Sequence, residues 1–458
     1  MNILIIGNGF DLAHGLPTKY EDFLDFCYAI EYICDREISI YPENIDNIEE
    51  KIEEIKINNN VKPVVSRVFR KDLSEFCYTK VISKIYSYLK ENAWFKYFMR
   101  IRNQGLMVGK NWIDFESEIS KVIQQIRKIR NYYDDDEKIK NGFVNWESYK
   151  DADVLFSCMN MHEVFPNLKT DNESGLTKFM IFNSSSIGSV ENVDIILNIL
   201  LRDLNEITRV LEIYIDAGIN NVTLSSNNKV KDFRNINPDH VLSFNYSNTY
   251  NRLYDQVGED ETCHIHDKTC YIHGKANVFH TLENCNLVLG IDEFLHGKKK
   301  DRELEYLPFK KFYQRIYKSP DNEYLDWVDE IKDGYADYIK RQQNNIYAYE
   351  QSKRDGSITQ PFQMQKFEEA FNEKMPKHTV YIFGHSLDVT DKDVLKLFIC
   401  NDNVETKIYY HRKNRDDRED LGKKIKNLIK IMGQEELIRR TGGAHKTIEF
   451  IPQTLTAD

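Results

Sequence analysis

Short runs of branched apolar residues recur along the chain. The first, Asn2–Ile6, is continuously apolar after Asn2 and stops at Gly7-Asn8-Gly9. Such runs are typical of parallel strands that are covered on both faces. Six later runs have the same character: Val241–Phe244, Cys270–Ile272, Leu287–Leu289, Thr379–Phe383, Thr406–Tyr410 and Thr447–Ile451. The pattern therefore predicts an α/β fold built on a parallel sheet.

The spacing of apolar residues changes between residues 28 and 235. Glycine is sparse there, and apolar residues recur at helical spacing, as in Val64–Leu89 and Val193–Ala217. Polar clusters such as Asn58-Asn59-Asn60 are typical of loops between helices. We therefore expect a discontinuous sheet domain of residues 1–28 and 236–458. A helical insertion domain of residues 29–235 should cover one end of it.

Composition narrows the class of protein. The 458 residues include 62 Lys and Arg against 73 Asp and Glu, a net charge of −11, which is unsuited to coating nucleic acid. The eight cysteines form no Cys-x-x-Cys pair and read as reduced thiols. Met1–Ile6 is too short for a secretory signal, and no stretch reaches the roughly 20 apolar residues of a membrane helix. We expect a soluble, cytoplasmic protein without a membrane partner.

The turn after the first predicted strand suits a pyrophosphate group. Glycines at Gly7 and Gly9 let the backbone approach a ligand, and a helix N-terminus supplies N–H groups. The usual fingerprint has a third glycine where this chain has Leu12. The alternative interpretation is a tight strand-to-helix turn.

A longer stretch, Gly7–Pro17, resembles the opening motif of the sirtuins, which pairs Gly-Ala-Gly with Gly-Ile-Pro at the same spacing. Extended to Phe23, it looks still more like the start of the AbiH abortive-infection family of bacterial phage-defence proteins. Three later motifs follow in sirtuin order: Ser243-Phe244-Asn245-Tyr246-Ser247, Ile272-His273-Gly274 and Gly384-His385-Ser386-Leu387.

The resemblance implies a Rossmann-like, sirtuin-like fold that binds NAD⁺. In it Asn245 would reach the nicotinamide-side ribose, and His273 would be the catalytic histidine. The expected dinucleotide-binding residues are Gly7, Asn8, Gly9, Asp11, Gly384, His385 and Ser386. Because the carboxyl ends of parallel strands converge, we expect one pocket to be lined by Gly7, Asn8, Gly9, Asn245, His273, Gly384 and Ser386.

Departures from the sirtuin pattern restrict the reaction. Thr18-Lys19-Tyr20 stands where sirtuins have Asp-Phe-Arg, and the four-cysteine zinc module of the deacetylases is missing. Without an acyl-peptide acceptor, the simplest reaction is attack of water on the same ribosyl carbon. NAD⁺ is then a substrate. Neutral His273 would accept a proton, and Asn245 would orient ribose or water.

Each residue also has a purely structural interpretation. Asn245 would cap the next segment, His273 would be a satisfied histidine at a strand end, and Asp11 would cap a helix. Asp388 or Asp391 would cap the helix that follows Ser386. For Asn245 and His273 we favour function because they belong to an ordered set of motifs.

Two further groups of residues, a Cys/His group and an acidic aromatic motif, each have two interpretations. Cys263, His264, His266, Cys270 and His273 lie close together in sequence, but their spacing is not that of a known zinc finger, and we expect no metal. Trp112-x-Asp114-Phe115-Glu116 either brings an acidic group over the pocket or is a helix start with an aromatic anchor.

The favoured hypothesis is an antiphage NAD⁺ glycohydrolase that depletes NAD⁺ on infection. The main alternative is a sensor that binds a nucleotide without turnover and reports it through the helical insertion. A defence nuclease and a dehydrogenase rank below both. Expected partners are NAD⁺ or a related nucleotide, a phage-derived trigger and a second copy of the chain. We further expect Gly9→Val to impair nucleotide binding first.

Overall fold

A sheet of six strands forms the centre of the protein. The computed structural model describes residues 1–36, 45–74, 79–103, 115–133, 150–159, 190–224, 229–233, 236–255, 268–291, 304–359 and 361–454. The strands are β1 (Asn2–Ile6), β2 (His240–Ser243), β3 (Thr269–Tyr271), β4 (His378–Phe383), β5 (Val404–Tyr410) and β6 (Ile448–Pro452). They run in the order β3-β2-β1-β4-β5-β6, and every neighbouring pair is parallel. The predicted parallel α/β sheet is confirmed.

One predicted strand is wrong. Residues Leu287–Leu289 are buried but belong to no strand. The side chain of Gln314 takes the place of a neighbouring strand. Its Oε1 accepts from the N–H of Leu289 at 3.0 Å, and its Nε2 donates to the carbonyl of the same residue at 2.9 Å. A run of apolar residues indicates that a segment is buried, but a buried segment need not pair with a neighbouring strand if its backbone has other hydrogen-bond partners.

Helices and loops cover both faces of the sheet, which explains the unbroken apolar run in β1. Ile3 and Ile5 pack in a cluster with α17 (Lys392–Ile399), α18 (Glu419–Met432) and the start of α15 (Tyr324–Arg354). Leu4 and Ile6 face the other way, toward α1 (Asn8–Ala13) and α13 (Thr249–Tyr254). Because both faces of the strand are buried, neither carries polar residues.

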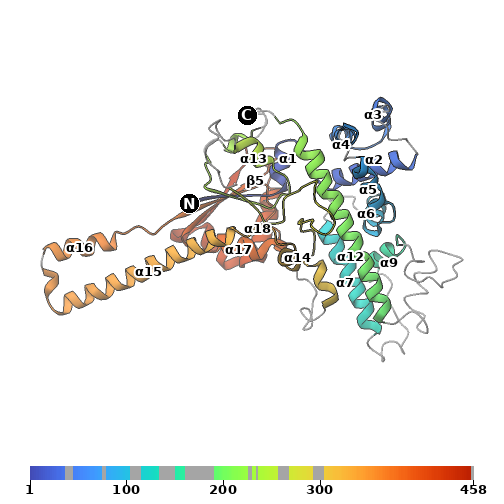
Figure 1. Cartoon of the computed structure of the whole chain (residues 1–458). Helices are drawn as coiled ribbons and strands as arrows, with labels where there is room; N and C mark the ends of the chain where they lie inside the picture. The colour runs from blue at the N-terminus through green and yellow to red at the C-terminus, as the bar shows by residue number, and fades with distance from the viewer. Residues whose placement is uncertain are drawn as a thin grey trace.

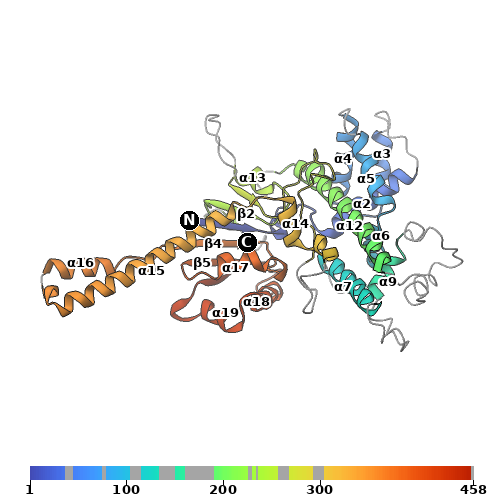
Figure 2. The same ribbon diagram turned by 60° about the horizontal axis from the view of Figure 1, so that its bottom comes forward.

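A group of helices connects β1 to β2. It comprises α2 (Tyr20–Asp35), α3 (Ile45–Glu54), α4 (Lys62–Ser74), α5 (Thr79–Lys90), α6 (Ala93–Asn103), α7 (Phe115–Tyr133), α9 (Lys150–Phe156) and α12 (Val190–Ile213). Figures 1 and 2 show this helical region on one side of the sheet, whereas α15 and α16 (Pro361–Phe371) project from the opposite side. Helix α2 runs unbroken past residue 28, and the division at that residue stays a prediction.

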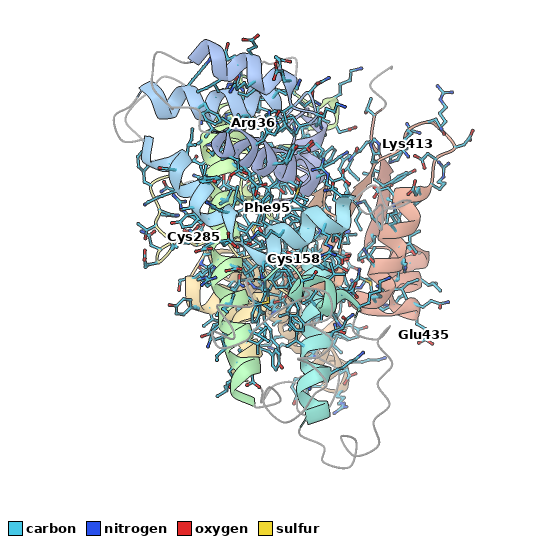
Figure 3. All side chains as sticks on the ribbon, turned by 90° about the vertical axis from the view of Figure 1, so that its right-hand side faces the viewer. Arg36, Phe95, Cys158, Cys285, Lys413 and Glu435 are labelled. Atoms are coloured by element: carbon cyan, nitrogen blue, oxygen red, sulfur yellow. The ribbon has the colours of Figure 1, made fainter. Side chains whose placement is uncertain are left out.

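Aromatic stacking in the helical region fixes the start of α7. The ring of Phe115 stacks on Phe98 at 4.0 Å between centroids and on Tyr20 at 4.2 Å. These rings belong to a large apolar cluster that also contains Phe95, whose crowded surroundings are visible in Figure 3. Since Phe115 is held by both neighbours, the following residue, Glu116, has a defined position.

The remaining helices follow the sheet strands. Helix α14 (Lys311–Lys318) lies between β3 and α15, and α19 (Gln434–Thr441) lies between α18 and β6. Among the residues that the structure describes, no helix is both long and apolar enough to cross a membrane.

Candidate active site

The turns that follow β1 and β4 contact each other through backbone atoms. Strands β1 and β4 are neighbours, with Ile6 opposite Phe383. A Cβ atom on Gly9 would lie 2.7 Å from the Cα of Gly384, and one on Gly384 would lie 2.1 Å from the nitrogen of Phe10. Gly384 also has φ of +68°, which side chains disfavour. The glycines are therefore needed for the two turns to pack.

These turns already use several of their own amides. The N–H of Gly7 donates to Phe383 at 3.2 Å, that of Gly9 to Gly384 at 2.8 Å and that of Phe10 to Gly7 at 2.8 Å. The tight-turn interpretation thus accounts for the close backbone approach. Contact of Gly7, Asn8 and Gly9 with a pyrophosphate stays a prediction, and it requires donors other than these three amides.

Asn245 joins the end of β2 to the first glycine turn. Its Nδ2 donates to the carbonyl oxygen of Gly7 at 3.1 Å, and only 6% of the residue is exposed. The N-cap position of helix α13 is Asn248, three residues further on, so Asn245 is not the cap of that helix. Its backbone is tied to Ser243, whose Oγ donates to the Asn245 carbonyl at 3.1 Å. The side chain is held in place at the carboxyl edge of the sheet.

Two histidines converge on one buried carboxylate, that of Asp391. Nε2 of His273 lies 3.4 Å from Oδ1 of Asp391, and Nε2 of His385 lies 3.4 Å from Oδ2. The first distance is at the outer limit for a hydrogen bond, and its geometry leaves Nε2 of His273 without a fully formed one. Catalytic hydrogen bonds are often long until a substrate is bound.

The expectation that Asp388 or Asp391 caps the helix after Ser386 is confirmed for Asp388. Its Oδ1 accepts from the N–H of Thr390 at 3.1 Å in the short 3-10 helix Val389–Asp391. Asp391 occupies the N-cap position of α17. The side chain of Asp391 makes no capping bond and turns toward the histidines.

The loop that carries His385 is strained. Leu387 has φ of +57°, an uncommon conformation for a branched side chain. Its N–H donates to Nδ1 of His385 at 2.9 Å, so in the neutral ring the proton is on Nε2, facing Asp391. Strain of this kind concentrates at functional sites. Ser386, next to His385, is exposed, and its carbonyl accepts from Asn427 at 3.1 Å.

A buried lysine completes the cluster. Nζ of Lys311 donates to Oδ1 of Asp391 at 3.2 Å and lies 2.8 Å from Oε2 of Glu116. Lys311 begins α14, and Glu116 comes from the first turn of α7 in the helical region. Both interpretations of the Trp-x-Asp-Phe-Glu motif hold for its described residues. Phe115 is the aromatic anchor at the start of α7, and Glu116 brings an acidic group to the cluster. Trp112 and Asp114 lie outside the described residues.

Burial and the contacts between these side chains determine which of them are charged. Burial would raise the pKa of Asp391, but Lys311 and the two histidines outweigh it and lower that pKa well below its ordinary value. Burial disfavours the Lys311 ammonium, but Asp391 and Glu116 outweigh it and raise its pKa. Burial and the nearby Lys311 lower the pKa of His273. The site therefore combines a carboxylate, an ammonium and a neutral imidazole at neutral pH.

Asp11 forms a separate polar contact. It lies inside α1, so the cap interpretation is wrong. Ser247 Oγ donates to its Oδ2 at 2.6 Å, and its Oδ1 has no hydrogen-bond partner in the described part of the chain. Burial raises the pKa of Asp11 to about 6. A contact with a ribose hydroxyl stays a prediction. The side chain of Asn8 donates to the carbonyl of Thr18 at 3.0 Å.

The predicted catalytic pair lies at one edge of the sheet. Backbone bonds run from Phe244 to Ile6 at 2.9 Å and from Ile272 to Ser243 at 3.1 Å, which aligns the ends of β1, β2 and β3. Asn245 and His273 each follow one of these bonds by one residue. The Phe244 ring packs edge-on against His273 at 5.3 Å and against His385 at 4.3 Å.

The zinc alternative gains no support within the described ranges. Cys263, His264 and His266 lie outside them. Cys270 packs in the sheet-face cluster, where its Sγ donates to the carbonyl of Asp321 at 3.5 Å. No group of three or more potential ligands was found among the described residues.

Fold and site define an α/β protein with a buried polar cluster at the carboxyl edge of a parallel sheet. The family model described as "Bacteriophage abortive infection AbiH" matches residues 3–411. The chain therefore belongs to the AbiH family, which implies a role in abortive-infection defence against phage. No curated protein and no solved structure matches it.

Proposed function

We propose that this AbiH protein hydrolyses NAD⁺ at the nicotinamide–ribose bond, with Asn245 and His273 as its catalytic residues. The convergence of the ends of β1, β2, β3 and β4 carries the proposal. The strand order β3-β2-β1-β4-β5-β6 is that of the Rossmann dinucleotide-binding fold. In that fold the ligand lies where the order reverses, here between β1 and β4. The sirtuin-like motifs follow these strands.

The reaction needs little more than positioning. Cleavage of the nicotinamide–ribose bond leaves an oxocarbenium-like ribose, and neutral nicotinamide departs without an acid because it begins as a cation. One water attacks the ribosyl carbon, and its proton passes to His273. The products are nicotinamide, ADP-ribose and one proton. The lowered pKa of His273 suits it to accept that proton near neutral pH.

Asn245 would orient the ribose or the water. Its amide nitrogen already donates to Gly7, which fixes the plane of the side chain. The amide oxygen then remains as the acceptor that would meet a ribose hydroxyl. Phe244 supplies an apolar surface beside both histidines, which limits the access of bulk water.

A nucleotide sensor is the second candidate. The observation that favours it is the burial of Asn245, His273 and His385, which are 6%, 5% and 3% exposed. Substrate entry would require these side chains to become accessible, whereas a ligand that stays bound would require this only once.

Incubation of the purified chain with NAD⁺ separates these candidates. Free nicotinamide and ADP-ribose are measured by chromatography, and NAD⁺ binding by calorimetry, with and without lysate from phage-infected cells as a source of trigger. Equal amounts of both products support hydrolysis. Tight binding without either product, in both conditions, contradicts hydrolysis and supports the sensor. Absence of both binding and products contradicts both candidates.

A further inference from the structure

A continuous chain of charged contacts links the helical region to the two histidines. It begins at Glu116 in the first turn of α7, passes through Lys311 at 2.8 Å and reaches Asp391 at 3.2 Å. From there the two carboxylate oxygens divide between His273 and His385, each at 3.4 Å. The residues come from four separate parts of the sequence.

We propose that Asp391 positions both histidines and that Glu116, acting through Lys311, couples their state to the position of α7. Asp391, Lys311 and Glu116 are positioning residues, since none needs to touch the substrate. The catalytic consequence rests on the proposed NAD⁺ hydrolysis, whereas the coupling itself does not.

Electrostatics make a purely stabilising role a poor explanation. The side chains of Lys311, Asp391 and Glu116 are only 5%, 10% and 15% exposed. Removing such charges from water offsets most of their mutual attraction, and apolar replacements of buried ion pairs are often as stable. A buried charged triad is better explained by what it controls, and here it controls the proton positions on two imidazoles.

The carboxylate sets those proton positions. The Leu387 N–H donates to Nδ1 of His385, so the proton of that ring is on Nε2 and faces Asp391. Asp391 likewise favours a proton on Nε2 of His273, which leaves Nδ1 of His273 as the basic nitrogen. Among the described residues, Arg315 of α14 also acts on the charge of His273, and it is paired with Asp393. A shift of α7 would move Glu116, change the field of Lys311 on Asp391 and alter the basicity of His273.

Histidine NMR on the full-length chain tests the coupling without any substrate. The ring ¹⁵N signals of His273 and His385 are assigned by single His→Gln replacements and followed with pH in the wild type and three variants. Loss of negative charge in Asp391→Asn or Glu116→Gln should lower the pKa of His273, and the effect of Glu116→Gln should be the smaller. Lys311→Met should raise it by about one pH unit.

Glu118→Gln is the matched control. Glu118 lies two residues further along α7, is similarly buried and pairs with Lys121 rather than with Lys311. It should leave both histidine signals unchanged. If Glu116→Gln behaves like Glu118→Gln while the protein remains folded, the coupling is overturned. Because Glu116→Gln is conservative, this comparison holds even where Asp391→Asn does not fold. A failure of NAD⁺ hydrolysis would leave the NMR result unaffected.

Discussion

Gly9 donates its backbone N–H to the carbonyl oxygen of Gly384 at 2.8 Å, and this bond joins the turns that follow β1 and β4. Because the two turns meet backbone to backbone, the carboxyl ends of the two strands at the reversal of strand order are held rigidly. The residues that follow, Asp11 on one side and His385 on the other, take their positions from this contact.

The first prediction concerns these glycines. Gly9→Ala would place its Cβ 2.7 Å from the Gly384 Cα, so we expect a loss of about 3 kcal/mol in the free energy of unfolding. Gly422→Ala is the control, because no atom lies within 4 Å of its Cβ position and the residue is helical. It should gain about 0.5–1 kcal/mol. Equal unfolding curves for wild type and Gly9→Ala would contradict the packing argument.

The same contact revises our expectation for Gly9→Val, which should unfold the turn before it affects nucleotide binding.

The second prediction concerns Asn245. Asn245→Ala removes one of the two hydrogen bonds to the buried Gly7 carbonyl, which keeps the N–H of Phe10, so it should cost about 1 kcal/mol of stability. It should lower nicotinamide release about 10²–10⁴-fold. Asn403→Ala is the matched control. Asn403 is equally buried and donates to the carbonyl of Ile331 at 3.0 Å, but it precedes β5 at the amino edge of the sheet. It should lose similar stability and keep its activity. Similar activity in the two variants would remove Asn245 from the site.

The third prediction follows from Asp11. Its pKa rises from 3.8 to about 6 on folding, so ionised Asp11 opposes folding. This cost is absent below pH 3.8, grows between pH 3.8 and 6, and is complete above pH 6. Asp11→Asn keeps an acceptor for Ser247 and removes the charge. Thermal melts should show the variant more stable at neutral pH by up to about 3 kcal/mol. The advantage should shrink toward pH 4. A pH-independent difference would contradict the raised pKa.

The fourth prediction concerns the pH dependence of NAD⁺ hydrolysis. Burial and the nearby Lys311 lower the pKa of His273 from 6.5, so its basic form persists below that pH. The rate of nicotinamide release by the wild type should therefore stay level as the pH falls from about 8 to 6.5 and decline only at lower pH. A rate that has already halved at pH 6.5 would mean that His273 is not the base.

Most of the sheet could be predicted from the sequence because strands buried on both faces must be apolar throughout. Six of the seven predicted runs are strands. The exception, Leu287–Leu289, shows the limit of this signal. A buried segment can satisfy its backbone largely through side chains, here those of Gln314, Tyr246 and Lys318, and the spacing of apolar residues does not indicate this.

The site was predicted only in part. The placement of Asn245 and His273 at the carboxyl edge could be predicted because parallel strands end at a common edge, whereas their catalytic roles stay predictions. The sequence offered Asp391 only as an alternative to Asp388 for capping the next helix, because both residues lie just before one. Lys311 was missed because it resembles any lysine at the start of an amphipathic helix. Their charges meet only through the tertiary fold. The Trp-x-Asp-Phe-Glu motif was the one local signal that pointed to Glu116.

The comparison of His273→Ala with His378→Ala in phage-infected cells tests the central claim most directly. His378 is a buried histidine at the opposite, amino end of β4 and has no ring hydrogen bond in the described structure. Melting temperature, cellular NAD⁺ and phage protection are measured for both variants. The account predicts that both melt near the wild type, and that only His273→Ala fails to lower NAD⁺ and fails to protect. If His273→Ala melts normally and still protects cells, NAD⁺ hydrolysis is the wrong function.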